Sequence, residues 1–211
     1  MTAKCYNIQQ TNNLLAFFDK NFETRRKAFF RLKELFQKEN VRWSLACSSN
    51  LFFRGIVDDF HDFDIIVQLT DIPKVMEIMN TSGAELLETG GNGYCESDKY
   101  LHYFFYRCDV DIIAGFRVNT FGTTFQYNYS ESQTELINLD YMQFPLVPVE
   151  VQYILYGMME GWQQHRKFKR RIIEEYLHNT GILFPEIFRN AICNFSLPEW
   201  LVSKINNLLR E

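Results

Sequence analysis

Three aspartates lie in two short apolar runs of this sequence, at a spacing that suits metal chemistry. Asp62 and Asp64 begin the run DFDIIV, and Asp111 lies in the run VDII. Because a strand points alternate side chains to the same face, both carboxylates of the first run face the same way. Like charges held that close repel each other unless a cation lies between them. Carboxylate oxygens suit Mg²⁺, which completes its coordination with water and substrate phosphates, so the three residues predict a magnesium site.

Two alternatives stay open for these acids. Asp109 lies two residues before Asp111 and can face the same way, so it is a second candidate for the third carboxylate. Asp111 is preferred because its neighbours are more apolar. Asp62 and Asp64 could instead be strand-end residues that cap loops or pair with arginines.

The composition is that of a folded protein of moderate size. Of the 211 residues, 46% are hydrophobic and 16% are aromatic, which is enough for a substantial core. The formal net charge of −4 argues against a general nucleic-acid binder, because such proteins are usually basic.

The cysteines and the N-terminus indicate the compartment. The five cysteines are scattered and contain no C-x-x-C pair, which favours free thiols in a reducing environment. The N-terminus lacks the apolar core of a signal peptide, and no apolar run reaches the roughly 18 residues of a membrane span. We therefore expect a cytoplasmic protein with no membrane partner.

Hydrophobic periodicity predicts a mixed α+β fold. Helices are expected over 21–38, 149–178, 184–193 and 198–210, and a further helix is expected to begin at 71. A short helix is expected to end at Gly55, with Ser48 or Ser49 as its N-terminal cap. Strands are expected over 41–47, 62–67, 85–89, 100–106 and 110–113, with a turn over 89–93 and a hairpin or ordered loop over 119–132. This pattern predicts a mixed β-sheet with covering helices over residues 1–145 and a helical C-terminal part, residues 146–211, packed on it.

The order of these motifs resembles the nucleotidyltransferase superfamily related to DNA polymerase beta. The pattern there is an apolar residue, Gly, then Gly or Ser, about a dozen residues, a D-x-D pair on a strand, and one Asp on a later strand. Here Cys47-Ser48-Ser49 occupies the first element, with Ser48 where the family usually has glycine. The compact size and helical C-terminus look most like the small lincosamide and aminoglycoside nucleotidyltransferases.

The resemblance implies roles for the residues at the matching positions. Asp62, Asp64 and Asp111 would be the catalytic carboxylates and would hold Mg²⁺, two ions when an NTP is bound. Ser48 and Ser49 would lie at a helix N-terminus that approaches the nucleotide phosphates.

Further basic and polar side chains are candidates for nucleotide contacts. Asn50 follows the serine pair, although helix capping is its simpler role. Arg54 closes the same helix and could reach a phosphate, with an exposed ion pair to Asp58 or Asp59 as an equal alternative. Arg166, Lys169 and Arg170 are spaced to share one helix face that could hold phosphates. The alternative is a solvated face paired with the glutamates that follow.

The resemblance implies an antibiotic-resistance-like enzyme that transfers a nucleoside monophosphate from an NTP to a hydroxyl of a small acceptor and releases pyrophosphate. A small acceptor is expected because the chain is short, acidic and without an evident nucleic-acid surface. One alternative is a catalytically weak or inactive nucleotide-binding or regulatory module of the same fold, which Ser48 in place of glycine would suit. Another is a member that modifies a protein or an RNA end.

Overall fold

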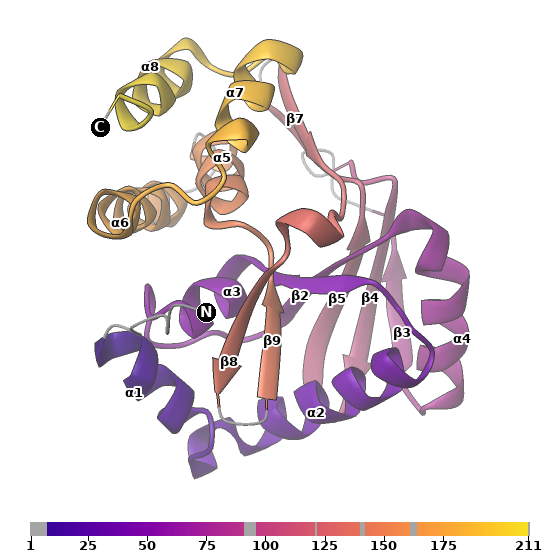
Figure 1. Ribbon diagram of the computed structural model, residues 1–211. Coiled ribbons are helices and arrows are strands. Elements are labelled where there is room, and N and C mark those ends of the chain that lie inside the picture. Colours follow the sequence, from indigo (N-terminus) through magenta and orange to yellow (C-terminus); the bar gives the residue numbers. More distant parts are fainter. Residues whose placement is uncertain (1–7, 91–95, 121, 140–141, 161–163, 211) are drawn as a thin grey trace.

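The computed structural model describes residues 8–90, 96–120, 122–139, 142–160 and 164–210 (Figure 1). The main sheet has seven strands in the order β3-β4-β5-β2-β1-β9-β8, and β6 and β7 form a separate two-stranded sheet. The strands are β1 Trp43–Ala46, β2 Phe63–Val67, β3 Glu85–Thr89, β4 Lys99–Phe105, β5 Cys108–Ala114, β6 Phe116–Thr120, β7 Thr123–Tyr127, β8 Glu135–Leu139 and β9 Met142–Leu146. The helices are α1 Ile8–Ala16, α2 Glu23–Lys38, α3 Cys47–Phe53, α4 Ile72–Thr81, α5 Val149–Met159, α6 Gln164–Thr180, α7 Pro185–Asn194 and α8 Glu199–Leu208.

The centre of the main sheet mixes both pairing directions. Strand β2 pairs antiparallel with β1 and parallel with β5. In this register Asp64 on β2 lies opposite Ala46 on one side and Asp111 on the other. The short strand-to-helix connection at Ala46 and the two aspartates therefore lie side by side on three neighbouring strands.

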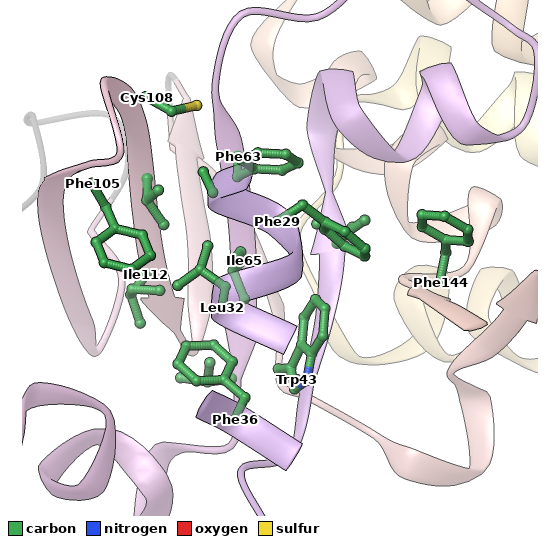
Figure 2. Packing of buried hydrophobic residues seen from close by; sticks show 14 of the residues in the cluster. Phe29, Leu32, Phe36, Trp43, Phe63, Ile65, Phe105, Cys108, Ile112 and Phe144 are labelled. Carbon is green, nitrogen blue, oxygen red and sulfur yellow. The ribbon is translucent and has the colours of Figure 1, made fainter. Parts of the chain in front are cut away.

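One face of the sheet is covered by α2, which presents an apolar stripe at helical spacing. Its buried residues Phe29, Leu32 and Phe36 point toward the sheet residues around Trp43 and Ile112 (Figure 2). Helices α1, α3 and α4 join the same core. Aromatic rings fill much of it: the Phe29 and Phe144 rings are stacked with their centroids 5.1 Å apart.

The other face carries a second core built around α5. All 11 residues of α5 are buried, and it packs with α6, α7, α8 and the β6–β7 hairpin. The sheet contributes Ile66 and Ile113 to this core. Apart from Glu150 and Gln152 the helix has no charged or amide side chain, and such a helix must be enclosed, which these neighbours do.

The predicted elements agree with the structure over β1 to β5 and at the C-terminal helices α7 and α8, and they differ at the N-terminus and between residues 116 and 180. The helix expected over 149–178 is divided between α5 and α6, and the hairpin expected within 119–132 lies at 116–127. Helix α1 and strands β8 and β9 were not predicted. The turn expected over 89–93 falls partly outside the described residues.

The predicted domain boundary at residue 145 falls inside β9, and α5 begins three residues after that strand ends, at Val149. The helices that follow share their core with β6 and β7 from the preceding part of the chain. The division of the chain into two domains at residue 145 therefore stays a prediction.

Cys47, Cys108 and Cys193 carry free thiols, while Cys5 and Cys95 lie outside the described residues. Over the described ranges, every helix is too short or too polar to cross a bilayer.

Candidate active site

Asp62, Asp64 and Asp111 line one cavity of about 540 Å³. The cavity also receives Ser48 from α3 and Tyr100 from β4. Its opposite wall comes from the helical part, through Tyr156 and Met159 of α5 and Arg166 and Lys169 of α6. A space of this size lies within the range of small-molecule sites.

The strand register explains why the acids meet. Asp64 and Asp111 are direct neighbours on the parallel pair β2–β5. Asp62 lies two residues before Asp64, at the entrance to β2, and lines the same cavity. The rival position, Asp109, does not line it: its side chain is 53% exposed against 17% for Asp111, and it contacts His102 Nε2 at 3.2 Å. The geometry thus groups Asp111, and not Asp109, with the D-x-D pair.

The carboxylates repel one another. Burial, and then the charges of Asp62 and Asp111, hold the pKa of Asp64 well above its usual range. Burial also raises the pKa of Asp111, against the opposing effect of its hydrogen bond from Tyr100. Clustered buried carboxylates are stable as anions only beside positive charge, so this group of oxygen ligands fits a hard divalent cation.

Two of the acids are held by neighbouring side chains. Ser48 Oγ donates to Asp62 Oδ1 at 3.2 Å, and Tyr100 Oη donates to Asp111 Oδ1 at 3.0 Å. His102 Nδ1 lies 2.8 Å from the same oxygen of Asp111. Across the described ranges, no group of three or more His, Cys, Asp or Glu side chains is arranged so that it could hold a metal ion as it stands.

The start of α3 has an unusual backbone. Cys47 has φ +46°, in the left-handed region that glycine adopts without strain, whereas Ser48 does not. The position that calls for glycine is therefore Cys47, and the departure that the sequence pattern placed at Ser48 lies one residue earlier. Neither serine caps the helix: the N-cap is Ala46, which has no side-chain cap. The backbone N–H of Cys47 donates to Gln152 Oε1 at 2.9 Å.

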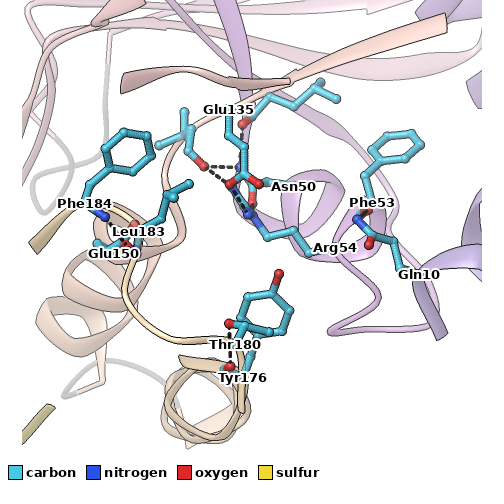
Figure 3. Close-up of polar contacts among 12 residues, drawn as sticks. Gln10, Asn50, Phe53, Arg54, Glu135, Glu150, Tyr176, Thr180, Leu183 and Phe184 are labelled. Carbon is cyan, nitrogen blue, oxygen red and sulfur yellow. Dashed lines mark hydrogen bonds and ion pairs between the residues drawn. The ribbon is translucent and has the colours of Figure 1, made fainter. Parts of the chain in front are cut away.

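Three of the predicted nucleotide contacts have internal partners instead. Ser49 Oγ donates to the Ala46 carbonyl, and Asn50 Nδ2 donates to the carbonyls of Leu45 and Val147. Arg54, only 1% exposed, donates to Asn50 Oδ1 and pairs with Glu135 (Figure 3). Ser49, Asn50 and Arg54 do not line the cavity, because their polar groups join α3 to β1, to β8 and to the end of β9.

The basic cluster on α6 is also divided. Arg166 and Lys169 line the cavity, and their charged groups lie 5.6 and 5.4 Å from the centre of the Tyr156 ring. Burial, and then the charge of Arg166, lowers the pKa of Lys169. Arg170 points elsewhere: it is buried and forms ion pairs with Glu160 and Glu174.

The cavity thus has an acidic wall and a basic wall. Within the described part of the chain, neither Arg166 nor Lys169 forms an ion pair with a carboxylate. The positive charge of each nevertheless opposes the rise in the pKa of Asp64. Two cations facing a set of buried acids suit a polyanion that is bound together with metal ions.

The sequence did not identify Tyr100, His102 and Tyr156 as site residues. Tyr100 and His102 are two residues apart on β4, so the alternation of side chains along a strand places them on the same face. Only the β4–β5 register, in which His102 lies opposite Asp111, shows that this face belongs to the site. Tyr156 lies on a helix that is buried on every side, where no periodicity separates a site residue from the core.

The comparisons with known proteins concern the fold. No protein-family model matches the chain, and no curated protein matches its sequence. Among solved structures, the crystal structure of ANT(2'')-Ia in complex with adenylyl-2''-tobramycin aligns with 73% of this chain and 90% of its own, at 11% identity and a TM-score of 0.53. A candidate nucleotidyltransferase from Thermotoga maritima aligns with 73% of this chain and 95% of its own, at 15% identity and a TM-score of 0.50.

The lincosamide antibiotic adenylyltransferase LnuA, solved with bound lincomycin, covers 70% of this chain at 15% identity and a TM-score of 0.48. The predicted α+β class and mixed sheet are confirmed by the structure and by the two alignments with the higher scores. The chain therefore has a nucleotidyltransferase fold, related to that of the small antibiotic-type nucleotidyltransferases.

Proposed function

We propose that the protein transfers a nucleoside monophosphate from an NTP to a hydroxyl of a small acceptor and releases pyrophosphate. The observation that carries this proposal is the two-sided cavity, with Asp62, Asp64 and Asp111 on one wall and Arg166 and Lys169 on the other. The nucleotidyltransferase fold supports it independently.

Asp62, Asp64 and Asp111 are the residues that would hold Mg²⁺, two ions with the NTP. Bound Mg²⁺ would neutralise the phosphates and stabilise the charge that develops during an in-line displacement. The donor set fits this role because it consists of carboxylate oxygens, and because burial, followed by the charges of Asp62 and Asp111, raises the pKa of Asp64.

The remaining steps belong to the side chains. Arg166 and Lys169 hold the phosphates, and their fixed positive charge favours release of pyrophosphate. Asp111 accepts the proton of the attacking hydroxyl: it accepts a hydrogen bond from the Tyr100 hydroxyl, and burial raises its pKa, which favours proton uptake. Asp62 also accepts a hydrogen bond from a hydroxyl, that of Ser48. Phe116 and Met159 supply apolar surface for an acceptor or a base.

A second function, nucleotide binding without turnover, is favoured by one specific observation. Cys47 holds the left-handed conformation with a side chain, and its N–H is already engaged by Gln152. A backbone N–H that is already hydrogen-bonded and lies beside a Cβ is less available to a phosphate than the N–H of a glycine would be.

Two measurements separate these functions. With Mg²⁺ and an NTP we expect the melting temperature to rise, and we expect Asp64→Asn to abolish the rise because it removes a central metal ligand. Asp109→Asn is the matched control: it removes an exposed carboxylate on the same strand as Asp111 and should leave the rise intact.

Release of pyrophosphate with a panel of hydroxyl acceptors then distinguishes an enzyme from a binding module. The absence of a shift with all four NTPs would refute both functions.

A further inference from the structure

The cavity already contains a hydroxyl at the carboxylate proposed to act as the base. Tyr100 lies on β4, lines the cavity, and donates from Oη to Asp111 Oδ1 at 3.0 Å. His102 Nδ1 approaches the same oxygen at 2.8 Å, so Asp111 is held against the strand that carries Tyr100.

An acceptor hydroxyl has two geometric requirements in this reaction. It must lie within hydrogen-bond distance of the base that takes its proton, and it must lie in contact with the phosphorus that it attacks. Tyr100 meets the first requirement. It also lines the space into which Asp64, Arg166 and Lys169 face, which is where the phosphates would lie.

Resting on the proposed function, we propose that Tyr100 is itself a modification site, onto which the protein transfers a nucleoside monophosphate from a bound NTP. A bond forms between Tyr100 Oη and the α-phosphorus, and the bond from that phosphorus to the oxygen bridging to the β-phosphorus breaks. Pyrophosphate leaves with that electron pair, and the phenolic proton passes to Asp111. No oxidant or reductant is needed.

The other hydroxyls near the site are placed differently. Tyr156 Oη faces Lys169 Nζ at 3.5 Å, on the basic wall. Ser48 Oγ donates to Asp62, at the end of the cavity where α3 begins. Tyr103 lies on the opposite face of β4, fully buried, and its hydroxyl has no partner among the described residues.

A nucleotide on Tyr100 would occupy the position of an external acceptor hydroxyl. The modified chain would therefore be blocked toward acceptors, and an acceptor that binds first would compete with the labelling. This relation gives the proposal a second readout besides the label itself.

The test uses the full chain with Mg²⁺ and each of the four NTPs labelled at the α-phosphate. We expect an intact mass raised by one nucleoside monophosphate, and peptide mapping that assigns it to Tyr100. Tyr100→Phe should reduce the label to background. Tyr103→Phe, which removes a phenolic hydroxyl from the same strand without breaking a hydrogen bond to a described residue, should be labelled like the wild type.

A mixing experiment tests whether the transfer occurs within one chain. Asp64→Asn keeps Tyr100 but lacks a central carboxylate, and Tyr100→Phe keeps the carboxylates but lacks the phenol. Neither variant alone should be labelled, nor should their mixture, and the labelling rate constant of the wild type should not depend on protein concentration. Label on Tyr100 of the mixed Asp64→Asn chain would overturn transfer within one chain.

The failures of the two proposals are distinguishable. A protein that binds an NTP and releases pyrophosphate with an external acceptor, but is unlabelled or labelled at Ser48 or elsewhere, would overturn the Tyr100 proposal and leave the proposed function standing. A protein that shows no shift in melting temperature with any NTP would overturn both.

Discussion

Cys47 carries a side chain in a backbone conformation where glycine is the usual residue. A left-handed conformation costs a residue with a Cβ on the order of 1 kcal/mol. Cys47→Gly and Cys47→Ala both remove the thiol, and only the alanine variant keeps the Cβ. We expect the glycine variant to be more stable than the alanine variant by about 1 kcal/mol, measured by denaturant unfolding. Equal stability, or a more stable alanine variant, would show that the backbone here is not strained.

Two of the three arginines predicted to bind nucleotide, Arg54 and Arg166, should behave in opposite ways. Arg54 is buried and pairs with Glu135, so Arg54→Ala removes hydrogen bonds to the Glu135 carboxylate, the Asn50 amide oxygen and the Val147 carbonyl. We expect a loss of about 3–5 kcal/mol in the free energy of unfolding.

Arg166→Ala removes a side chain that faces the cavity, so it should change stability by less than about 0.5 kcal/mol and weaken NTP binding instead. Thermal unfolding and NTP titration of both variants check this contrast. A stable Arg54→Ala protein that has lost NTP binding would contradict the structural role given to Arg54.

The sequence was informative about single residues only where local spacing decides their position. The aspartates were found because a strand period and an apolar run place them together without knowledge of distant partners. The burial of Asn50 and Arg54 depends on Val147 and Glu135, which lie far along the chain and come near only when β8 and β9 join the sheet. A helix pattern alone contains no trace of such partners.

The start of α4 is held by Asp71, whose contribution to the stability of the fold depends on pH. Asp71 precedes α4, and its carboxylate accepts hydrogen bonds from Arg42 Nε at 3.0 Å and from the Arg42 backbone N–H at 3.0 Å. These bonds, led by the one from the side chain, hold the pKa of Asp71 below its usual range. The stabilisation is therefore present above the ordinary pKa of an aspartate, near 4, and is lost as the pH falls through the lower pKa of the folded state.

Replacing Asp71 by Asn should cost about 1 kcal/mol at pH 7, since the Arg42 side chain is half exposed and the charge contribution is screened. The difference in the free energy of unfolding between wild type and variant should narrow as the pH drops below about 4. Urea unfolding of both proteins as a function of pH measures this difference. A difference that stays constant down to the acid limit would show that the charge of Asp71 does not contribute.

Two of the elements that sequence reasoning missed contain residues that argue against their structure. In α1 the buried positions include Gln10 and Asn13, whose amides donate to the carbonyls of Phe53 and Phe52 at the end of α3. Strand β9 contains Pro145, a residue that normally argues against a strand inside a sheet. Helix α1 is fixed by hydrogen bonds to distant backbone, and β9 by its place between β1 and β8, which no local pattern reveals.

On the scale of the whole molecule, the cavity lies between two cores that share α3 and otherwise draw on different helices. The acids come from the sheet and the cations Arg166 and Lys169 come from α6, so a bound NTP with Mg²⁺ would join the two sides. We expect NTP and Mg²⁺ to slow amide exchange in residues 164–170 as well as in β2 and β5. Hydrogen-exchange mass spectrometry tests this. Protection confined to the two strands would show that α6 takes no part in binding.

The fold class could be predicted because the central strands and the long α2 have strong patterns of their own. The arrangement of the helices around α5 could not, since a helix in which nearly every residue is apolar gives little information about which neighbour covers which side. The cations of the site were found by their spacing on α6, but which of them enter the cavity depends on how α6 packs against α5.

The parallel pairing of β2 with β5 has a consequence for the order of folding. Asp64 and Asp111 become neighbours only after the chain between them, with α4, β3 and β4, has returned to the same place in the sheet. Contacts between residues so distant in sequence form slowly, because the loop must close before the pairing contributes any stability. A refolding chain can thus regain its helices before it has a nucleotide site. Recovery of NTP binding would therefore report the completion of the central sheet and should follow the recovery of helical signal in time.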